Sequence, residues 1–334
     1  MLKIFRSLVI FFLLFLITSI ILIQIDRYGF FKRDKFLYNY VDLYEKINLG
    51  LKKNSKTVVL GTSRPYLSFN PDYTDKNIFN SSSHVMLPKH YIYAVNSYTQ
   101  NSNVKEFIIF LDFFTANQNL KRTNNLKLYN CLYKEGSFCK FKDLFSLYYN
   151  WSNILSSVKL MFSSNKTNLY IEENGFFKSS NYEKIYSKMS RNNWFKRVEN
   201  DYKKRIFNNA KFNFEENSNY IKFLNFLCKV KTKKNIKFTL AIPPVHKKML
   251  EIIYNNKLNK NYIDWKKSLI LVNKKCNIDI YDFTNVNLDD DEFYEISHIR
   301  ESYMNKIQDV IINYEFNIPF TMNEEIVSNS ILLF

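Results

Sequence analysis

The feature that most constrains this chain is an uncharged apolar run near its N-terminus. Residues 8–25 read LVIFFLLFLITSIILIQI, in which only Thr18, Ser19 and Gln24 are polar. A helix rises about 1.5 Å per residue, so about 18–20 such residues span the hydrocarbon core of a bilayer. A cleaved signal peptide would have a shorter apolar region and small residues at a cleavage site. We therefore predict an uncleaved, single-pass membrane anchor over residues 1–26.

The charges around this run leave its orientation open. Lys3 and Arg6 precede it, and four basic residues lie between positions 27 and 35, so positive charge flanks both ends. No second apolar run of comparable length follows. The charges alone therefore do not say on which side of the membrane the rest of the chain lies.

Short apolar segments alternate with amphipathic segments on both sides of a less regular middle region. Residues 107–111 (FIIFL) are apolar throughout, which is typical of a parallel strand covered by helices on both faces. The alternation predicts an α/β layer fold with a parallel sheet. Strands are expected at 56–60, 107–111, 236–242 and 278–283, and helices at 40–51, 89–98, from 220, at 246–254, at 265–275 and around 303–314.

The same patterns divide the chain into segments. Residues 27–55 are predicted to form a juxtamembrane linker and helix, residues 56–318 the α/β domain, and residues 319–334 a C-terminal tail. Within the domain, residues 113–215 are rich in Asn, Ser, Lys and Tyr and show weak periodicity. We interpret them as an inserted, partly helical cap.

The formal net charge of +17 restricts the candidate partners. The lysines are spread along the chain without a dense basic block, which does not favour a nucleic-acid-binding protein. A solvated Lys-rich surface explains the charge, and attraction to an anionic envelope polymer or to lipid headgroups is the functional alternative.

The four cysteines do not form a CxxC pair, and the chain has only four histidines, so we expect no metal site. Cys131 and Cys139 are close in sequence and could form a disulfide in an oxidising compartment. Cys228 lies on an apolar helical stripe and is assigned to the core, whereas the environment of Cys276 is left open.

Glycine is scarce, with five residues in the whole chain, and their positions allow neither G-x-G-x-x-G nor a P-loop. We therefore expect no nucleotide cofactor. Gly61 follows the first predicted strand in the sequence VVLGTSRP, which indicates a position without room for a side chain.

Ser63 lies on the turn that follows Gly61, at the predicted carboxyl end of a strand. A serine at such a turn can act as a nucleophile, because its oxygen is exposed and nearby backbone N–H groups can bind an oxyanion. A serine that only caps the short helix through its hydroxyl would give the same tripeptide.

A carboxylate and a histidine lie close together before the last predicted helix, in the sequence EISHIR. Glu295 precedes His298 by three residues, so the carboxylate could orient the imidazole while the imidazole accepts a proton from a hydroxyl. A surface histidine beside a solvated acidic loop is the alternative. His246, in IPPVH, is assigned a structural or helix-capping role.

Taken in chain order, these motifs resemble the SGNH (GDSL-like) hydrolase superfamily. They are most similar to its membrane-anchored branch that acts on envelope polymers, which includes the teichoic acid D-alanylation and alginate acetylation proteins. The resemblance covers roughly residues 56–314 and is carried by GTSR (61–64), NSS (80–82), LDFF (111–114), IPPVH (242–246), YDF (281–283) and EISHIR (295–300).

The resemblance implies a flavodoxin-like three-layer fold, with Ser63 as nucleophile and His298 as base. Glu295 stands where the family usually has Asp. Backbone N–H groups of Ser63 and of the loop from Asn80 through Ser81 to residue 82 are the expected oxyanion donors, although the family usually has Gly in that loop.

Four further positions bear on substrate binding. The family often has an Asn where this chain has Asp112, and an ionised carboxylate cannot donate a hydrogen bond. We therefore expect Asp112 to be structural and name Asn117 as a substitute donor. Arg64 and Arg300 flank the expected site and are candidates for binding an anionic substrate, with surface ion pairing as the alternative.

The resemblance implies a serine-dependent esterase or O-acyltransferase that acts on acyl groups of a cell-envelope polysaccharide. It also implies an extracytoplasmic domain, contact with the membrane and an acyl donor, and a membrane-bound acyltransferase as a further candidate partner. The alternative is a catalytically inactive accessory protein that binds a glycan or a partner in polysaccharide assembly, because fold resemblance alone does not establish activity.

Overall fold

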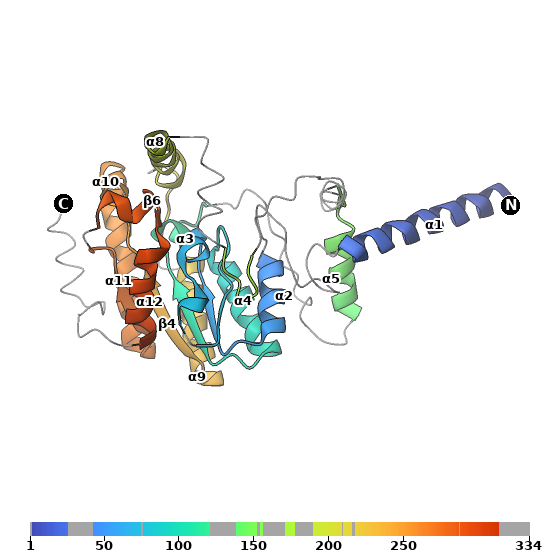
Figure 1. Ribbon diagram of the computed structural model, residues 1–334, viewed down its shortest axis with the longest axis horizontal. Coiled ribbons are helices and arrows are strands. Elements are labelled where there is room, and N and C mark those ends of the chain that lie inside the picture. The colour runs from blue at the N-terminus through green and yellow to red at the C-terminus, as the bar shows by residue number, and fades with distance from the viewer. Residues whose placement is uncertain are drawn as a thin grey trace.

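The protein consists of an α/β body from which one long N-terminal helix extends (Figure 1). The computed structural model describes residues 2–25, 43–74, 76–120, 138–151, 154–155, 171–177, 190–208, 210–215, 218–286 and 288–313. The body is built around a parallel sheet of five strands, and a separate two-stranded antiparallel hairpin lies near the C-terminus.

The central sheet has the strand order β2-β1-β3-β4-β5, and each neighbouring pair is parallel. Its strands are β1 (Thr57–Leu60), β2 (Ile78–Asn80), β3 (Glu106–Phe110), β4 (Lys237–Ile242) and β5 (Asp279–Asp282). Strand β2 lies on one side of β1, and the next strand in the chain, β3, lies on the other side, so the order in which strands are added to the sheet changes direction after β2. Carboxyl ends of all five strands therefore lie along one edge, which is where ligand sites form in open parallel sheets.

Helices connect the strands and cover the sheet. The α-helices are α1 (Leu2–Ile25), α2 (Leu43–Lys53), α3 (Ser63–Ser68), α4 (Pro88–Asn101), α5 (Phe138–Tyr148), α8 (Arg191–Asp201), α9 (Asn219–Lys234), α10 (Lys247–Asn255), α11 (Asn259–Cys276) and α12 (Glu301–Asn313). Helices α4, α9 and α11 pack in series, whereas α12 contacts α3. The shorter helical turns are η1 (Pro71–Tyr73), η2 (Phe113–Ala116), the π-helical η3 (Tyr202–Ile206) and η4 (Asp290–Glu292). The hairpin strands are β6 (Phe293–Glu295) and β7 (His298–Ile299).

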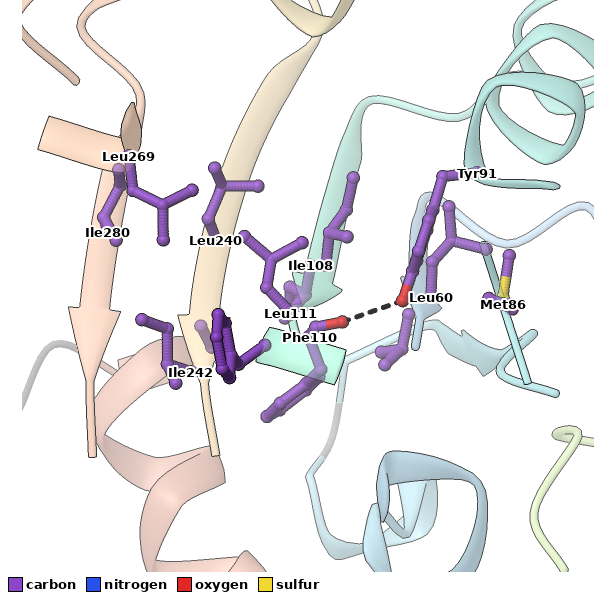
Figure 2. Packing of buried hydrophobic residues seen from close by; sticks show 14 of the residues in the cluster. Leu60, Met86, Tyr91, Ile108, Phe110, Leu111, Leu240, Ile242, Leu269 and Ile280 are labelled. Carbon is purple, nitrogen blue, oxygen red and sulfur yellow. Dashed lines mark hydrogen bonds between the residues drawn. The ribbon is translucent and has the colours of Figure 1, made fainter. Parts of the chain in front are cut away.

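The core lies between the sheet and these helices. Figure 2 shows aliphatic side chains of the strands, such as Ile108 and Leu240, packed beside Tyr91 of α4 and Leu269 of α11. The hydroxyl of Tyr91 donates a hydrogen bond of 3.1 Å to the carbonyl of Phe110, so this buried phenol is satisfied at the end of β3. Burial along β1, β3 and β4 is nearly continuous, which agrees with the mostly apolar sequences of these strands, and the polar Thr239 of β4 is buried as well.

The predicted α/β class is confirmed, and each predicted strand corresponds to a strand of the sheet within one or two residues. Two elements were not predicted. Strand β2 is only three residues long and ends in the polar Asn80, and the β6–β7 hairpin is similarly short. Neither carries the run of apolar residues by which the other strands were recognised.

Helix α1 is long and apolar enough to cross a membrane over Ile4–Gln24, and nearly all of that span is exposed. A signal sequence near the N-terminus can meet the same criteria of length and composition, so the uncleaved anchor stays a prediction. Of the predicted cap, the structure describes α5, α8, η3 and short stretches between them.

A disulfide joins Cys228 of α9 to Cys276 of α11, with a Cα–Cα distance of 5.5 Å. The expectation that Cys228 is buried is confirmed, but its pairing with a residue 48 positions away was not predicted. The predicted Cys131–Cys139 bond involves Cys131, which lies outside the described residues, so that pairing stays a prediction.

We predict that removing the Cys228–Cys276 bond lowers stability without changing the fold. Closing a loop of this length restricts the unfolded chain, so the double variant Cys228→Ser/Cys276→Ser should lose about 2–4 kcal/mol of unfolding free energy. Urea unfolding of the full chain in detergent micelles measures this loss. Alkylation of both cysteines in the native, non-reduced protein would show that the bond is absent and contradict the prediction.

Candidate active site

The turn after β1 brings the first candidate residue to the carboxyl edge of the sheet. Gly61 follows the last residue of β1, and a Cβ built there would lie 2.2 Å from Cγ of Pro65 and 3.0 Å from Cβ of Phe110. The predicted lack of space at Gly61 is therefore confirmed. This tight turn starts α3 at Ser63, whose side chain stays partly exposed.

Ser63 and His298, which are 235 positions apart, meet at this edge. The Oγ atom of Ser63 lies 2.7 Å from Nε2 of His298, within hydrogen-bond distance. His298 comes from β7, which follows the last strand of the main sheet in sequence and contacts α3. The structure thus places the predicted nucleophile and base in the geometry that general-base catalysis requires.

Glu295 completes a hydrogen-bonded series, here called the relay, that runs from Ser63 through His298 to Glu295. Its Oε1 forms a close contact with Nδ1 of His298 on the side of the ring opposite Ser63. Glu295 is fully buried, and an ionised carboxylate can only accept hydrogen bonds, so it fixes the proton on Nδ1. Nε2 is then free to accept the proton of the Ser63 hydroxyl.

Ser297 holds the carboxylate of Glu295 in place through two hydrogen bonds. The backbone N–H of Ser297 donates to Oε2 of Glu295 at 2.9 Å, and its hydroxyl donates to Oε1 at 2.7 Å. These bonds hold both carboxylate oxygens, while the Ser297 hydroxyl also lies 2.9 Å from Nδ1 of His298. The sequence analysis did not identify Ser297, although its position between Glu295 and His298 was the available signal.

The environment of Glu295 keeps it ionised. Burial by itself would raise the pKa of Glu295, but the interaction with His298 and the hydrogen bonds from Ser297 outweigh burial and lower this pKa below its usual value. The carboxylate is thus charged in the pH range where an imidazole can act as a base.

Asp112 binds the residues on both sides of Ser63. It follows β3 and is fully buried, and one of its carboxylate oxygens lies 2.5 Å from a guanidinium nitrogen of Arg64. Its other oxygen accepts a hydrogen bond from the hydroxyl of Thr62. Residues 62 and 64 flank Ser63, so one carboxylate holds both sides of the turn. This supports the expected structural role of Asp112.

The same ion pair changes the interpretation of Arg64. Only 5% of its side chain is exposed, and its guanidinium is directed at Asp112. We had named Arg64 as a candidate for binding an anionic substrate, but the structure uses its charge inside the protein. A buried charge must be paired, and Asp112 supplies the opposite charge from within the protein.

The predicted oxyanion donors all form hydrogen bonds within the protein. The backbone N–H of Ser63 donates to the carbonyl of His84 at 3.2 Å, and that of Asn80 to the carbonyl of Asn174 at 2.8 Å. The N–H of Ser81 donates to Val59 at 2.8 Å. The N–H of residue 82 donates to Oδ1 of Asn80 at 3.0 Å. In this conformation all four groups donate within the protein, and their role as oxyanion donors stays a prediction.

The other candidate side chains have structural partners. The Asn80 amide is buried and donates to the carbonyls of Pro65 and Phe69 at 2.8 Å each, which fixes α3. Asn117 accepts through Oδ1 from the backbone N–H groups of residues 119 and 213. It lines a hollow of about 210 Å³ whose described lining includes neither Ser63 nor His298.

Arg300 and His246 support the segment that carries the base. The Nε of Arg300 donates to the carbonyl of Asp291 at 2.7 Å, and its guanidinium lies over the ring of Tyr294. His246 accepts from the backbone N–H of Lys248, which confirms its capping role, and its other ring nitrogen lies 2.9 Å from Asp290. The contacts with Asp290, Asp291 and Tyr294 hold the segment that leads to Glu295.

Within the part of the chain that the structure describes, no group of three or more His, Cys, Asp and Glu residues could hold a metal ion. Comparison with protein-family models and with curated protein sequences finds no match to this chain. What the site can do must therefore be argued from its own geometry.

We predict that the buried Arg64–Asp112 pair is costly to break from one side only. Asp112→Asn leaves the guanidinium charge uncompensated and should cost about 3–5 kcal/mol of unfolding free energy. The double variant Arg64→Met/Asp112→Leu removes both charges and should cost clearly less than the single variant. Urea unfolding in detergent micelles measures both losses, and Asp282→Asn, which breaks the buried pair with Lys266, is the matched control. A single Asp112→Asn variant as stable as the unaltered protein would contradict this account.

A further prediction concerns the unfolding free energy at low pH. Because the folded-state pKa of Glu295 lies below its unfolded value, this group contributes stability above the usual glutamate range, and that contribution is lost as the pH falls through the folded pKa. We expect Glu295→Gln to be less stable at neutral pH and to lose less stability than the unaltered protein on acidification below about pH 4.5. Unfolding free energies measured across this range test the sign, and parallel curves for the two proteins would refute it.

Proposed function

We propose that this protein is a serine-dependent esterase or O-acyltransferase of the SGNH type, acting on acyl groups of a cell-envelope polysaccharide. The observation that carries the proposal is the relay from Ser63 through His298 to Glu295, with a distance of 2.7 Å between Oγ and Nε2. Two segments at opposite ends of the chain supply these groups, and their meeting at the carboxyl edge of a parallel sheet supports a shared chemical role.

In the proposed reaction, Oγ of Ser63 attacks the acyl carbonyl while Nε2 of His298 takes the hydroxyl proton. The negative charge of Glu295 stabilises the imidazolium that forms. The tetrahedral intermediate then expels the donor alcohol, which takes the proton back from His298, and the acyl group stays on Ser63 as an ester. Water or a sugar hydroxyl repeats these steps in reverse and removes the acyl group.

An oxyanion donor must be freed for this reaction. The hydrogen bond between the N–H of Ser63 and the carbonyl of His84 is the longest of the four described above, at 3.2 Å. A shift of the loop at His84 would free the N–H of Ser63 to donate to the substrate oxygen, as the backbone N–H groups of an oxyanion hole do. We therefore include this shift in the proposal.

The proposal includes a flavodoxin-like three-layer arrangement. The strand order 2-1-3-4-5 is that of flavodoxin-like sheets, which supports this assignment. The packing of α4, α9 and α11 in one group, with α3 and α12 in another, also supports it.

We also place the domain outside the cytoplasm, with α1 as a membrane anchor. Disulfides persist in oxidising compartments, so the Cys228–Cys276 bond supports this location. An envelope polysaccharide as substrate, an acyl donor and a membrane-bound acyltransferase as partner fit a protein held there, whereas we propose no role with nucleic acid.

A second candidate function is that of a non-catalytic accessory protein that binds a glycan or an assembly partner. The observation that favours it is the engagement of all four expected oxyanion N–H groups inside the protein. Such a protein would keep the fold and the relay geometry without accelerating ester chemistry.

Labelling with a fluorophosphonate separates the two functions. We expect the full chain in membranes to be labelled, Ser63→Ala to lose the label, and His298→Asn to react roughly 10²–10⁴ times more slowly. Ser190 is a matched control, because it is an exposed serine that also begins a helix, and Ser190→Ala should label normally.

Two results would overturn the enzymatic proposal. Undiminished labelling of Ser63→Ala would exclude this nucleophile. A folded protein that neither labels nor hydrolyses an acetylated model ester would instead support the accessory function.

A further inference from the structure

Helix α5 exposes a row of aromatic side chains that the α/β body does not cover. The exposed fractions are 82% for Phe138, 64% for Phe141 and 43% for Phe145, and Trp151 just beyond the helix is 71% exposed. Neighbouring rings in the row are stacked or tilted against one another at 6.4 Å between Phe138 and Phe141 and again between Phe141 and Phe145. So much contiguous aromatic surface in water is unfavourable and marks a contact face.

The C-terminal turn of α5 is fixed to the protein. Leu147 and Tyr148 are buried in a small cluster with Tyr44 of α2 and Leu22 of α1. The exposed row therefore belongs to a helix that is attached to the body at one end.

The aromatic row continues onto α1. The ring of Phe145 stacks on Tyr149 at 4.4 Å, and Phe15 of α1 lies 5.1 Å from the Tyr149 ring and 6.2 Å from that of Phe145. The hydroxyls of Ser19 and Tyr149 are in hydrogen-bond contact. The row on α5 thus joins the apolar surface of the candidate membrane span without a break.

These contacts fix the depth of α5 if α1 crosses a membrane. Ser19 and Phe15 lie five and nine residues before Gln24, the end of the span, which is about 8 and 14 Å along the helix. Figure 1 shows α5 (green) lying across the C-terminal end of α1 (blue). Leu22, which shares a buried cluster with Leu147 and Tyr148, lies two residues or about 3 Å before Gln24, so the packed end of α5 lies at the level of the lipid–water interface. The rings of Phe145 and Tyr149 reach from there toward the acyl chains beside Phe15.

We propose that α5 and Trp151 form a second membrane contact, in which the row of Phe138, Phe141, Phe145 and Trp151 inserts into the lipid interface beside α1. Lys142, which is exposed on the same helix, would reach the phosphate groups of the lipids. The lipid bilayer is the occupant because α1 already brings it to this face. This inference rests on α1 as a membrane span and not on the proposed enzymatic activity.

Tryptophan fluorescence tests the proposal directly, because the chain has three tryptophans and none lies in α1. Trp194 and Trp265 are 6% and 0% exposed inside the body, so Trp151 is the tryptophan that lipid can reach. We reconstitute the full chain into phosphatidylcholine vesicles with or without bromine on the acyl chains. Brominated lipid should quench part of the emission, and Trp151→Phe should remove that quenching. Equal emission in the two vesicle types would overturn the proposal.

A matched pair of positions provides the control. Phe141 on α5 and Leu271 on α11 are exposed to 64% and 66%, and both lie on helices. In the Trp151→Phe background, Phe141→Trp should restore quenching and Leu271→Trp should not. Quenching at neither position or at both positions would refute the proposal. Crosslinking of two chains through residue 141, without quenching, would assign the face to a second copy instead.

Discussion

The arrangement of the candidate site depends on one buried ion pair between Asp112 and Arg64. A carboxylate without exposure to solvent is tolerated only when it is paired, and here it is held by a guanidinium and by the hydroxyl of Thr62. Because these two partners flank Ser63, the end of β3 determines where the turn after β1 can lie. The hydroxyl thereby acquires a defined position at the sheet edge before any contact with His298 is considered. The amide of Asn80 fixes the other end of α3 in the same way.

Much of the sheet could be predicted, because β1, β3 and β4 are buried on both faces and therefore consist mostly of apolar residues. The meeting of Ser63 with His298 was predictable for a related reason, since residues that follow parallel strands come to the same edge. By contrast, the availability of an N–H group depends on which carbonyl faces it. The carbonyls of His84 and Asn174 come from loops that carry no periodic signal, so these partners of the N–H groups could not be predicted. The pairing of Cys228 with Cys276 was missed similarly, because it depends on how α9 packs against α11.

The region between β3 and α9 shows how a weak sequence signal can hide a defined surface. The region was interpreted as a partly helical cap with weak periodicity. The helical spacing of Phe138, Phe141 and Phe145 was not recognised, because a row of exposed rings does not follow the pattern of a helix that packs on a core. In the structure α5 packs on the rest of the chain at its C-terminal end, through Leu147 and Tyr148.

The hairpin of β6 and β7 has a consequence for the order in which the molecule is completed. Glu295, Ser297 and His298 come from one short stretch that follows all five strands of the main sheet, and α12 holds this end of the chain through hydrogen bonds of Gln308 and Glu301 to Asn70. A nascent chain that ends before residue 293 already contains the candidate membrane span, both cysteines of the disulfide and Ser63, but it lacks His298. The contact between Ser63 and His298 therefore forms only after this last part of the protein has emerged and docked against α3.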